Sequence, residues 1–237
     1  ENYPFCTIDP NTGIVPVPDK RMDALAAIVK PQKMQFATVE FVDIAGLVAG
    51  ASKGEGLGNQ FLAHIRETDA IAHVTRCFIN DDIIHVANSV DPIRDIEIIN
   101  TELALADLDS VTKAIDRNAK LVRAGHKDPA AKQLLVDKQE LLIKLQAHLN
   151  EAKAVRALAL TTDEKLLIRD MMLITAKPAL YIANVDEAAL KNGNALLDKV
   201  KAYAAAEGAQ VVPVCAAIEA EIGQLDEADK KSFLEDL

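Results

Sequence analysis

Residues 41–58 read FVDIAGLVAGASKGEGLG, and this stretch decides the fold class. It opens as an apolar strand, ends in Asp-x-x-Gly at Asp43 to Gly46, and enters a loop holding half of the chain's ten glycines. A carboxylate at a strand's C-terminal end is well placed to hold Mg²⁺ through water, and Gly46 lets a backbone N–H approach a terminal phosphate. The stretch predicts a nucleotide switch. On the tetrapeptide alone, a strand ending in a Gly-rich turn is the alternative.

The composition restricts the class of protein. Half of the 237 residues are apolar, and no apolar run approaches the ~20 residues of a membrane span, so we expect no membrane partner. The formal net charge of −10 argues against general nucleic-acid affinity of the whole surface, and we expect no specific DNA partner. The lone cysteines (Cys6, Cys77 and Cys215) and the absence of a signal-peptide pattern at the start favour a cytoplasmic location.

Strand and helix patterns alternate along the chain. Apolar, β-branched segments predict strands, and apolar residues at three- and four-residue spacing predict helices. The predicted strands are 13–18, 36–43, 70–78, 179–183 and 210–214, and the predicted helices are 19–30, 59–68, 195–207 and a tail from 217. A long helical region opens at Asp91-Pro92 and folds back at residues 125–129 as an antiparallel pair. We therefore expect a parallel α/β sheet with residues 91–175 inserted as a helical arm.

Further candidate residues lie in the loops where a doubly wound sheet binds ligands, beyond the carboxyl ends of its strands. Thr7 precedes the first strand, and its hydroxyl can complete the ligand shell of Mg²⁺ when nucleotide is bound. The alternative for Thr7 is a turn-stabilising residue beside proline. Cys215 and Ala216 follow the last strand, where small residues let backbone N–H groups approach a base.

The run Asn184-Val185-Asp186-Glu187 directly follows the strand that ends at Ala183. In GTPases the pattern Asn-Lys-x-Asp fills this position, and its Asp accepts two hydrogen bonds from guanine. Here Glu stands fourth and Val second, so the guanine-reading fork is absent or displaced and discrimination for guanine falls. The alternative is a helix capped by Asn184, with Glu187 at the capping-box position.

In chain order these elements match a GTPase-type domain, and five runs of sequence further resemble the YchF-type Obg-like ATPases. The runs are 2–8, 41–59, 66–70 (RETDA), 100–108 (NTELALADL) and 212–217. The resemblance extends over essentially all 237 residues. It implies a doubly wound P-loop NTPase sheet with an inserted helical arm and a C-terminal TGS domain. It also implies hydrolysis of ATP in preference to GTP, with Mg²⁺ as cofactor and the ribosome as partner.

The resemblance also assigns roles to the candidate residues. They match the switch I threonine that meets Mg²⁺ (Thr7), switch II (Asp43, Gly46) and the altered base-recognition element (Asn184, Val185, Glu187). Val185 is expected against the adenine. Leu47 falls where many GTPases carry the glutamine that orients the attacking water. Leucine cannot bind water, so no catalytic residue is assigned in this chain, and the water-positioning group comes from elsewhere or turnover is slow.

One departure from the family concerns the phosphate loop. The sequence contains no Gly-x-x-x-x-Gly-Lys-Ser/Thr. In the family this loop lies just upstream of position 1, so we interpret the chain as part of a longer protein. Residues 1–90 and 176–237 then belong to the nucleotide-binding domain and 91–175 to the arm. The alternatives are a non-catalytic ribosome- or protein-binding module acting through the arm, and a conventional GTPase.

Basic residues of the arm fall near one helical stripe, opposed mainly by Asp116. They are Lys113, Arg117, Lys120, Arg123 and Lys127. A solvated helix face is the ordinary interpretation of such a run. Contact with a phosphate backbone at the tip of the arm is the alternative.

Overall fold

The computed structural model describes residues 11–44, 57–83, 85, 89–226 and 229–230, without the side chains of 57–60. The chain divides into two compact units, formed mainly by Tyr3–Gly46 and by Leu47–Leu237. Thr7, Gly46 and Leu47 lie outside the described residues.

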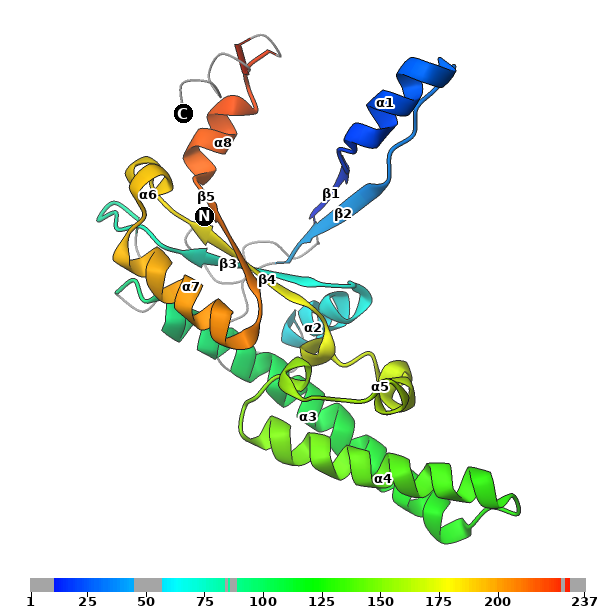
Figure 1. Ribbon diagram of the computed structural model, residues 1–237. Coiled ribbons are helices and arrows are strands. Elements are labelled where there is room, and N and C mark those ends of the chain that lie inside the picture. Colours follow the sequence, from blue (N-terminus) through cyan, green and yellow to red (C-terminus); the bar gives the residue numbers. More distant parts are fainter. Residues whose placement is uncertain (1–10, 45–56, 84, 86–88, 227–228, 231–237) are drawn as a thin grey trace. The chain divides into compact units, whose positions relative to one another are not determined.

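The first unit is a β-hairpin with a helix in its connection. Its elements are β1 (Asn11–Pro16), α1 (Lys20–Val29) and β2 (Thr38–Asp43) (Figure 1). Asp19 caps α1 by accepting a hydrogen bond from the Arg21 amide at 2.9 Å. The strands pair antiparallel, from Asn11 opposite Asp43 to Pro16 opposite Thr38. The expectation that both belong to the parallel sheet is therefore wrong, because the connection through α1 returns the chain in the opposite direction.

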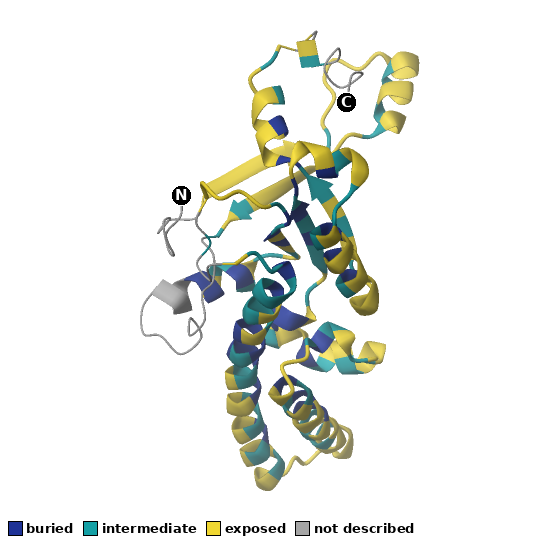
Figure 2. Cartoon of the chain, turned by 90° about the vertical axis from the view of Figure 1, so that its left-hand side faces the viewer, coloured by how far each residue is buried: buried dark blue, intermediate teal, exposed yellow. Residues whose placement is uncertain are grey.

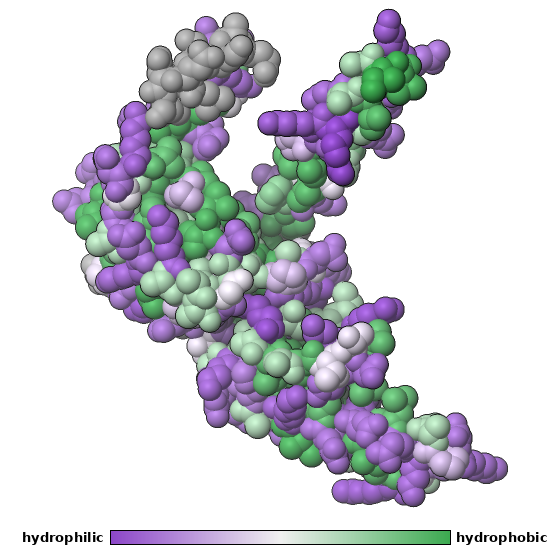
Figure 3. All heavy atoms as spheres, in the orientation of Figure 1, coloured by the Kyte–Doolittle hydropathy of each residue, from purple (hydrophilic) through white to green (hydrophobic). Residues whose placement is uncertain are grey.

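Exposed apolar side chains mark this hairpin unit. Ile28 and Val29 near the end of α1 are 80% and 69% exposed, and the helix presents hydrophobic surface in Figure 3. On the strands, Ile14 and Phe41 are exposed as well. Within the unit, the helix thus buries little apolar surface against its own strands.

The second unit contains the predicted parallel sheet. Its strands are β3 (Ile71–Arg76), β4 (Ala179–Asn184) and β5 (Gln210–Val214), in the order β3-β4-β5. The register places Arg76 opposite Asn184, and Asn184 opposite Val214. All three strands therefore end at the same edge of the sheet. The parallel arrangement predicted for these three segments is confirmed.

Outside the arm, the described part of this unit contains four helices. They are α2 (Leu57–Glu67), α6 (Glu187–Asn192), α7 (Ala195–Glu207) and α8 (Ala216–Ile222). The buried sheet face carries Tyr181 and Ala183, which pack in one hydrophobic cluster with Leu197 and Val200 of α7. The alternate residues point to the other face, where Val74 is 71% exposed.

The predicted helical pair is present in residues 92–150 (Figure 1). Its members are α3 (Pro92–Ala124) and α4 (Pro129–Asn150), followed by η1 (Val155–Ala157), α5 (Thr162–Ile168), η2 (Arg169–Met171) and η3 (Ile174–Ala176). Asp91 and Asp128 cap the two long helices, each followed by proline at the first helical position. Among the described residues, no helix combines the length and apolar content needed to cross a bilayer.

Apolar residues and side-chain amides hold α3 and α4 together. Val111 packs with Leu142 and Leu145 in a second hydrophobic cluster, and buried residues lie along both helices (Figure 2). The Asn118 side-chain amide of α3 is buried, and its Nδ2 donates to the Leu135 carbonyl and to Gln139 Oε1 of α4, both at 2.8 Å. The limits of the arm at residues 91 and 175 stay a prediction.

A buried histidine in the sheet predicts acid sensitivity. His73 faces Tyr181 at 5.4 Å between ring centroids, and its Nε2 has no hydrogen-bond partner among the described atoms. The pKa of His73 is lowered from 6.5 to about 4, mainly by burial and also by the Arg156 charge, while the Glu207 charge acts in the opposite direction. Because protonation then favours the unfolded state, stability present above pH 6.5 is lost as the pH falls toward 4, by about 2 kcal/mol at pH 5.

Urea unfolding at pH 7.5 and pH 5 of the wild type and His73→Gln measures this effect. We expect the acid-dependent loss to shrink in the variant. His126→Gln, at an exposed position near the turn between α3 and α4, is the matched control and should retain the wild-type pH dependence. Equal pH dependence in the wild type and His73→Gln would assign the acid sensitivity to other groups.

Candidate functional site

The ends of β3, β4 and β5 bring two of the predicted loops together. The Cys77 amide donates to the Asn184 carbonyl at 2.7 Å, and the Val185 amide donates to the Val214 carbonyl at 2.9 Å. The side chain of Asn184 then accepts a hydrogen bond from the Ala216 amide at 3.2 Å. The Asn-x-x-Glu run and the small-residue loop after β5 are therefore neighbours, joined through Asn184.

Asp186, and not Asn184, caps the helix that follows β4. Its Oδ1 accepts a hydrogen bond from the Ala189 amide at 2.8 Å, and α6 begins at Glu187. The alternative in which Asn184 caps this helix is therefore wrong, because Asn184 is still part of β4 and its side chain binds the next loop. Glu187 is exposed at the first position of α6.

Val185 and Cys215 have buried side chains. Val185 is 2% exposed and packs in the same cluster as Cys77 and Ala189. The predicted contact of Val185 with adenine stays a prediction, and substitutions there change core packing as well. Cys215 is 4% exposed, whereas Ala216 is exposed, and its backbone amide donates a hydrogen bond to the Asn184 side chain. Small side chains thus keep this loop close to the end of β4.

Arg76 organises the loop after β3, a role the sequence interpretation missed. Its guanidinium donates to the carbonyls of Phe78 at 3.2 Å and of Asn80 and Ile83 at 3.0 Å each. It also lies 4.7 Å from the centre of the Phe78 ring. The positive charge of Arg76 at the last position of β3 was the available signal. The same loop is held from α7's N-cap, where the Asn194 amide donates to the Cys77 carbonyl at 2.7 Å.

Asp43 is the described member of the predicted magnesium pair. It is exposed at the last position of β2 in the first unit. A carboxylate and a threonine hydroxyl are hard oxygen ligands of the kind that Mg²⁺ prefers, and this ion keeps several waters, so few protein ligands are needed. The donor set of Asp43 and Thr7 therefore fits Mg²⁺ in its chemistry.

The basic stripe of the arm is exposed along α3. Lys113, Arg117, Lys120 and Arg123 all face solvent. Lys113 pairs with Asp109 at 2.6 Å, so the expectation that Asp116 is the main opposing carboxylate is wrong for this lysine. The pairing follows the i, i+4 geometry of a helix surface.

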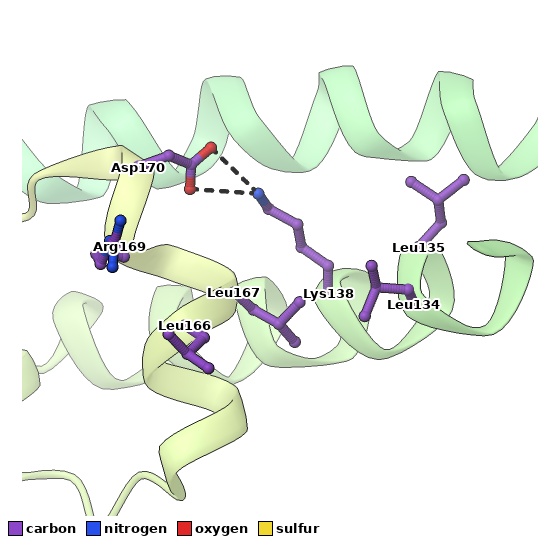
Figure 4. A pocket seen from close by; sticks show the side chains of 7 residues that line it. All are labelled: Leu134, Leu135, Lys138, Leu166, Leu167, Arg169 and Asp170. Atoms are coloured by element: carbon purple, nitrogen blue, oxygen red, sulfur yellow. Dashed lines mark hydrogen bonds and ion pairs between the residues drawn. The ribbon is translucent and has the colours of Figure 1, made fainter. Parts of the chain in front are cut away.

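A groove of about 650 Å³ lies on the same arm, between α4 and the segment α5–η2 (Figure 4). Leucines form its walls, and Lys138, Arg169 and Asp170 line it as well. Both carboxylate oxygens of Asp170 accept from Lys138 Nζ at 3.5 Å, which ties η2 to α4. This groove is lined by arm residues and includes none of the residues at the strand ends.

Parallel strands whose carboxyl ends carry the loops of a candidate ligand site are typical of α/β nucleotide-binding folds, and the comparisons with known proteins assign this one to the P-loop GTPase-like class. The chain belongs to the family described as 50S ribosome-binding GTPase, which matches residues 1–138.

Relatives cover the remainder of the chain as well. The ribosome-binding ATPase YchF of Haemophilus ducreyi is 59% identical over 236 residues, which are 100% of this chain and 63% of that protein. The protein of the same name from Bacillus subtilis is 50% identical over 238 residues, with the same coverage. The solved structure of the Schizosaccharomyces pombe YchF GTPase matches with a TM-score of 0.81 at 35% identity, over 99% of this chain and 63% of that one. The resemblance predicted from the sequence is confirmed, and the chain spans about 63% of the length of these relatives.

Proposed function

We propose that the full-length protein is a ribosome-associated, Mg²⁺-dependent ATPase switch acting in the cytoplasm. The observation that carries this is the loop pair at the ends of β4 and β5, joined by Asn184, with Glu187 exposed at the first position of α6. The names of the relatives, ribosome-binding ATPases, support both the nucleotide and the partner. In this proposal Asn184, Glu187, Cys215 and Ala216 surround the base.

The phosphate end of the site is assigned to the other candidates. Asp43 holds Mg²⁺ through water, Thr7 completes its ligand shell and the Gly46 amide meets the terminal phosphate. Mg²⁺ neutralises the charge that develops on the phosphate oxygens during transfer. Leu47 supplies no group that orients water, so intrinsic turnover is slow without a partner or a monovalent ion.

The test is a comparison of ATP and GTP on the full-length protein. We expect tighter binding of ATP and faster Mg²⁺-dependent hydrolysis of ATP. Equal affinity for GTP would overturn the specificity. An absence of hydrolysis, with ribosome binding retained, would favour a non-catalytic module acting through the arm.

Glu187→Asp is expected to shift the preference toward GTP. The guanine fork needs a carboxylate of Asp length, and one good base-edge pair is worth about 1–3 kcal/mol by analogy with nucleic-acid readout, which is roughly 5- to 150-fold in relative affinity. Glu187 is exposed and outside the core, so the change leaves packing intact. Competition binding with fluorescent nucleotide measures the ratio.

Glu219→Asp, at an exposed position in the first turn of α8, is the matched control and should leave the ratio unchanged. A ratio that stays at the wild-type value in Glu187→Asp would remove Glu187 from base recognition.

Charge reversal of the arm stripe is expected to weaken ribosome association. Replacing Lys113, Arg117, Lys120 and Arg123 with Glu removes cations that would neutralise RNA phosphates, so the affinity and its salt dependence both fall. Ribosome co-sedimentation at several salt concentrations measures this, with nucleotide affinity unchanged. A variant with Lys191, Lys199 and Lys201 changed to Glu on α6 and α7 controls for net charge. Unaltered co-sedimentation of the stripe variant would make the stripe a solvated face.

A further inference from the structure

Arg66, near the C-terminal end of α2, contacts the arm. Helix α2 begins at Leu57, directly after the Gly-rich stretch. One guanidinium nitrogen of Arg66 donates to Asp107 Oδ1 and to the Met172 carbonyl, both at 3.3 Å. The other donates to the Ala106 carbonyl and to Ser110 Oγ, both at 3.1 Å. A single side chain of α2 thus joins α3 and the segment between η2 and η3.

Asp107 is the buried partner in this contact. Its side chain is 0% exposed, against 26% for Arg66. Besides Arg66, it accepts hydrogen bonds from the amides of Ile174 at 3.0 Å and Thr175 at 2.7 Å, and from the Thr175 hydroxyl at 2.7 Å. A buried carboxylate with this many donors holds its surroundings in one arrangement, because water cannot replace a donor that leaves.

Lys177 also contacts the C-terminal end of α2. Its ammonium donates to the carbonyls of Ile65 at 2.8 Å and Arg66 at 2.7 Å, and also to the carbonyl of Thr68. These carbonyls lie at or beyond the last turn of α2, where a cation is favourable. Partial burial lowers the pKa of Lys177.

Helix α2 also carries buried apolar side chains. Phe61, Leu62 and Ile65 are buried on one side of the helix. A rotation of α2 about its axis would expose these side chains, and a shift along its axis would separate Arg66 from Asp107. The runs 66–70 and 100–108, both singled out in the sequence, meet at this ion pair.

We propose that Arg66, Asp107 and Lys177 form a joint between α2 and the helical arm. Through this joint, a change in the position of α2 that follows nucleotide binding at the adjoining Gly-rich stretch changes the position of the arm. The proposal rests on the proposed function, in which that stretch meets the terminal phosphate. Coupling of this kind is reciprocal: if nucleotide changes the affinity of the arm for the ribosome, the ribosome changes the affinity for nucleotide by the same factor. Arg66 is then a positioning residue that acts on α2 and the arm.

The test compares full-length wild type, Arg66→Gln and Lys144→Gln. Lys144 forms an ion pair with Glu164 at 2.9 Å between α4 and α5, so its removal breaks a contact within the arm that does not involve α2. The first readout is the ratio of ribosome affinities with a non-hydrolysable ATP analogue and with ADP. We expect a ratio of about fivefold or more in the wild type and in Lys144→Gln, and a ratio near one in Arg66→Gln.

The second readout is hydrogen exchange of the Ile174 and Thr175 amides, which donate to Asp107. ATP analogue should change their exchange in the wild type and leave it unchanged in Arg66→Gln. Arg66→Lys retains a cation but loses the planar, forked guanidinium, so we expect it to give a ratio of affinities between those of the wild type and Arg66→Gln. This variant carries the test if Arg66→Gln is poorly folded.

A wild-type ratio and nucleotide-dependent exchange retained in both Arg66 variants would overturn the joint. A wild-type protein that hydrolyses ATP but binds ribosomes equally in both nucleotide states would also overturn it, leaving the ATPase proposal standing. A wild-type protein without ATP hydrolysis would overturn the proposed function instead.

Discussion

Asp43→Ala in the full-length protein is expected to abolish Mg²⁺-dependent ATP hydrolysis, with a fall in turnover on the order of 10²-fold or more. The carboxylate stands at the exposed end of β2, where it can hold the waters of Mg²⁺. Without it, the ion that neutralises the transferring phosphate is poorly placed. Phosphate release at saturating ATP over a range of Mg²⁺ concentrations measures the effect.

Glu40→Ala provides the control for that experiment. Glu40 is an exposed carboxylate on the same strand, so its removal tests the general effect of losing a negative charge from β2. We expect turnover close to that of the wild type. If turnover of Asp43→Ala stays within a few-fold of the wild type, the metal assignment is wrong.

Asp107→Ala is expected to lower the free energy of unfolding by about 3–5 kcal/mol, the scale for breaking a buried ion pair. The substitution leaves Arg66 without its carboxylate and the buried amides of Ile174 and Thr175 without an acceptor. Each buried donor left unsatisfied adds its own desolvation cost. Urea unfolding at neutral pH, followed by circular dichroism, measures the change.

Asp109→Ala is the matched control, two residues further along α3. Asp109 is 63% exposed and its ion pair with Lys113 lies at the surface, so we expect almost no change in stability. Similar unfolding midpoints for Asp107→Ala and the wild type would show that the network around Asp107 contributes little to stability.

Several of the features predicted correctly from the sequence are fixed by local chemistry. Asp91-Pro92 starts α3 as predicted, because an N-cap carboxylate and a proline act within one turn of the helix. Helix α7 occupies the predicted residues 195–207, between its Asn194 cap and Gly208 at φ 68°. These signals need no knowledge of the rest of the fold.

The features missed depend on contacts between distant segments. The direction of the β1–β2 pair is set by backbone pairing across α1, which strand propensity does not encode. Asp186 and Asn184 are both good helix caps two positions apart, and only the end of β4 decides between them. The ion pair of Arg66 with Asp107 joins residues 41 positions apart, and charge patterns along a sequence do not identify such partners.

The buried Asn118 has a consequence for how the arm responds to force. Its amide meets the Leu135 carbonyl and Gln139 of α4 at one longitudinal alignment of the two helices. A slip of α4 past α3 by one turn, about 5.4 Å, would separate this buried amide from its present pair of acceptors, at a cost in free energy. A single polar pair of this kind selects one register in packed helices. The helices α3 and α4 therefore move together as one rigid pair. A displacement at one end of the pair is transmitted to the other end, because the helices do not slide past each other.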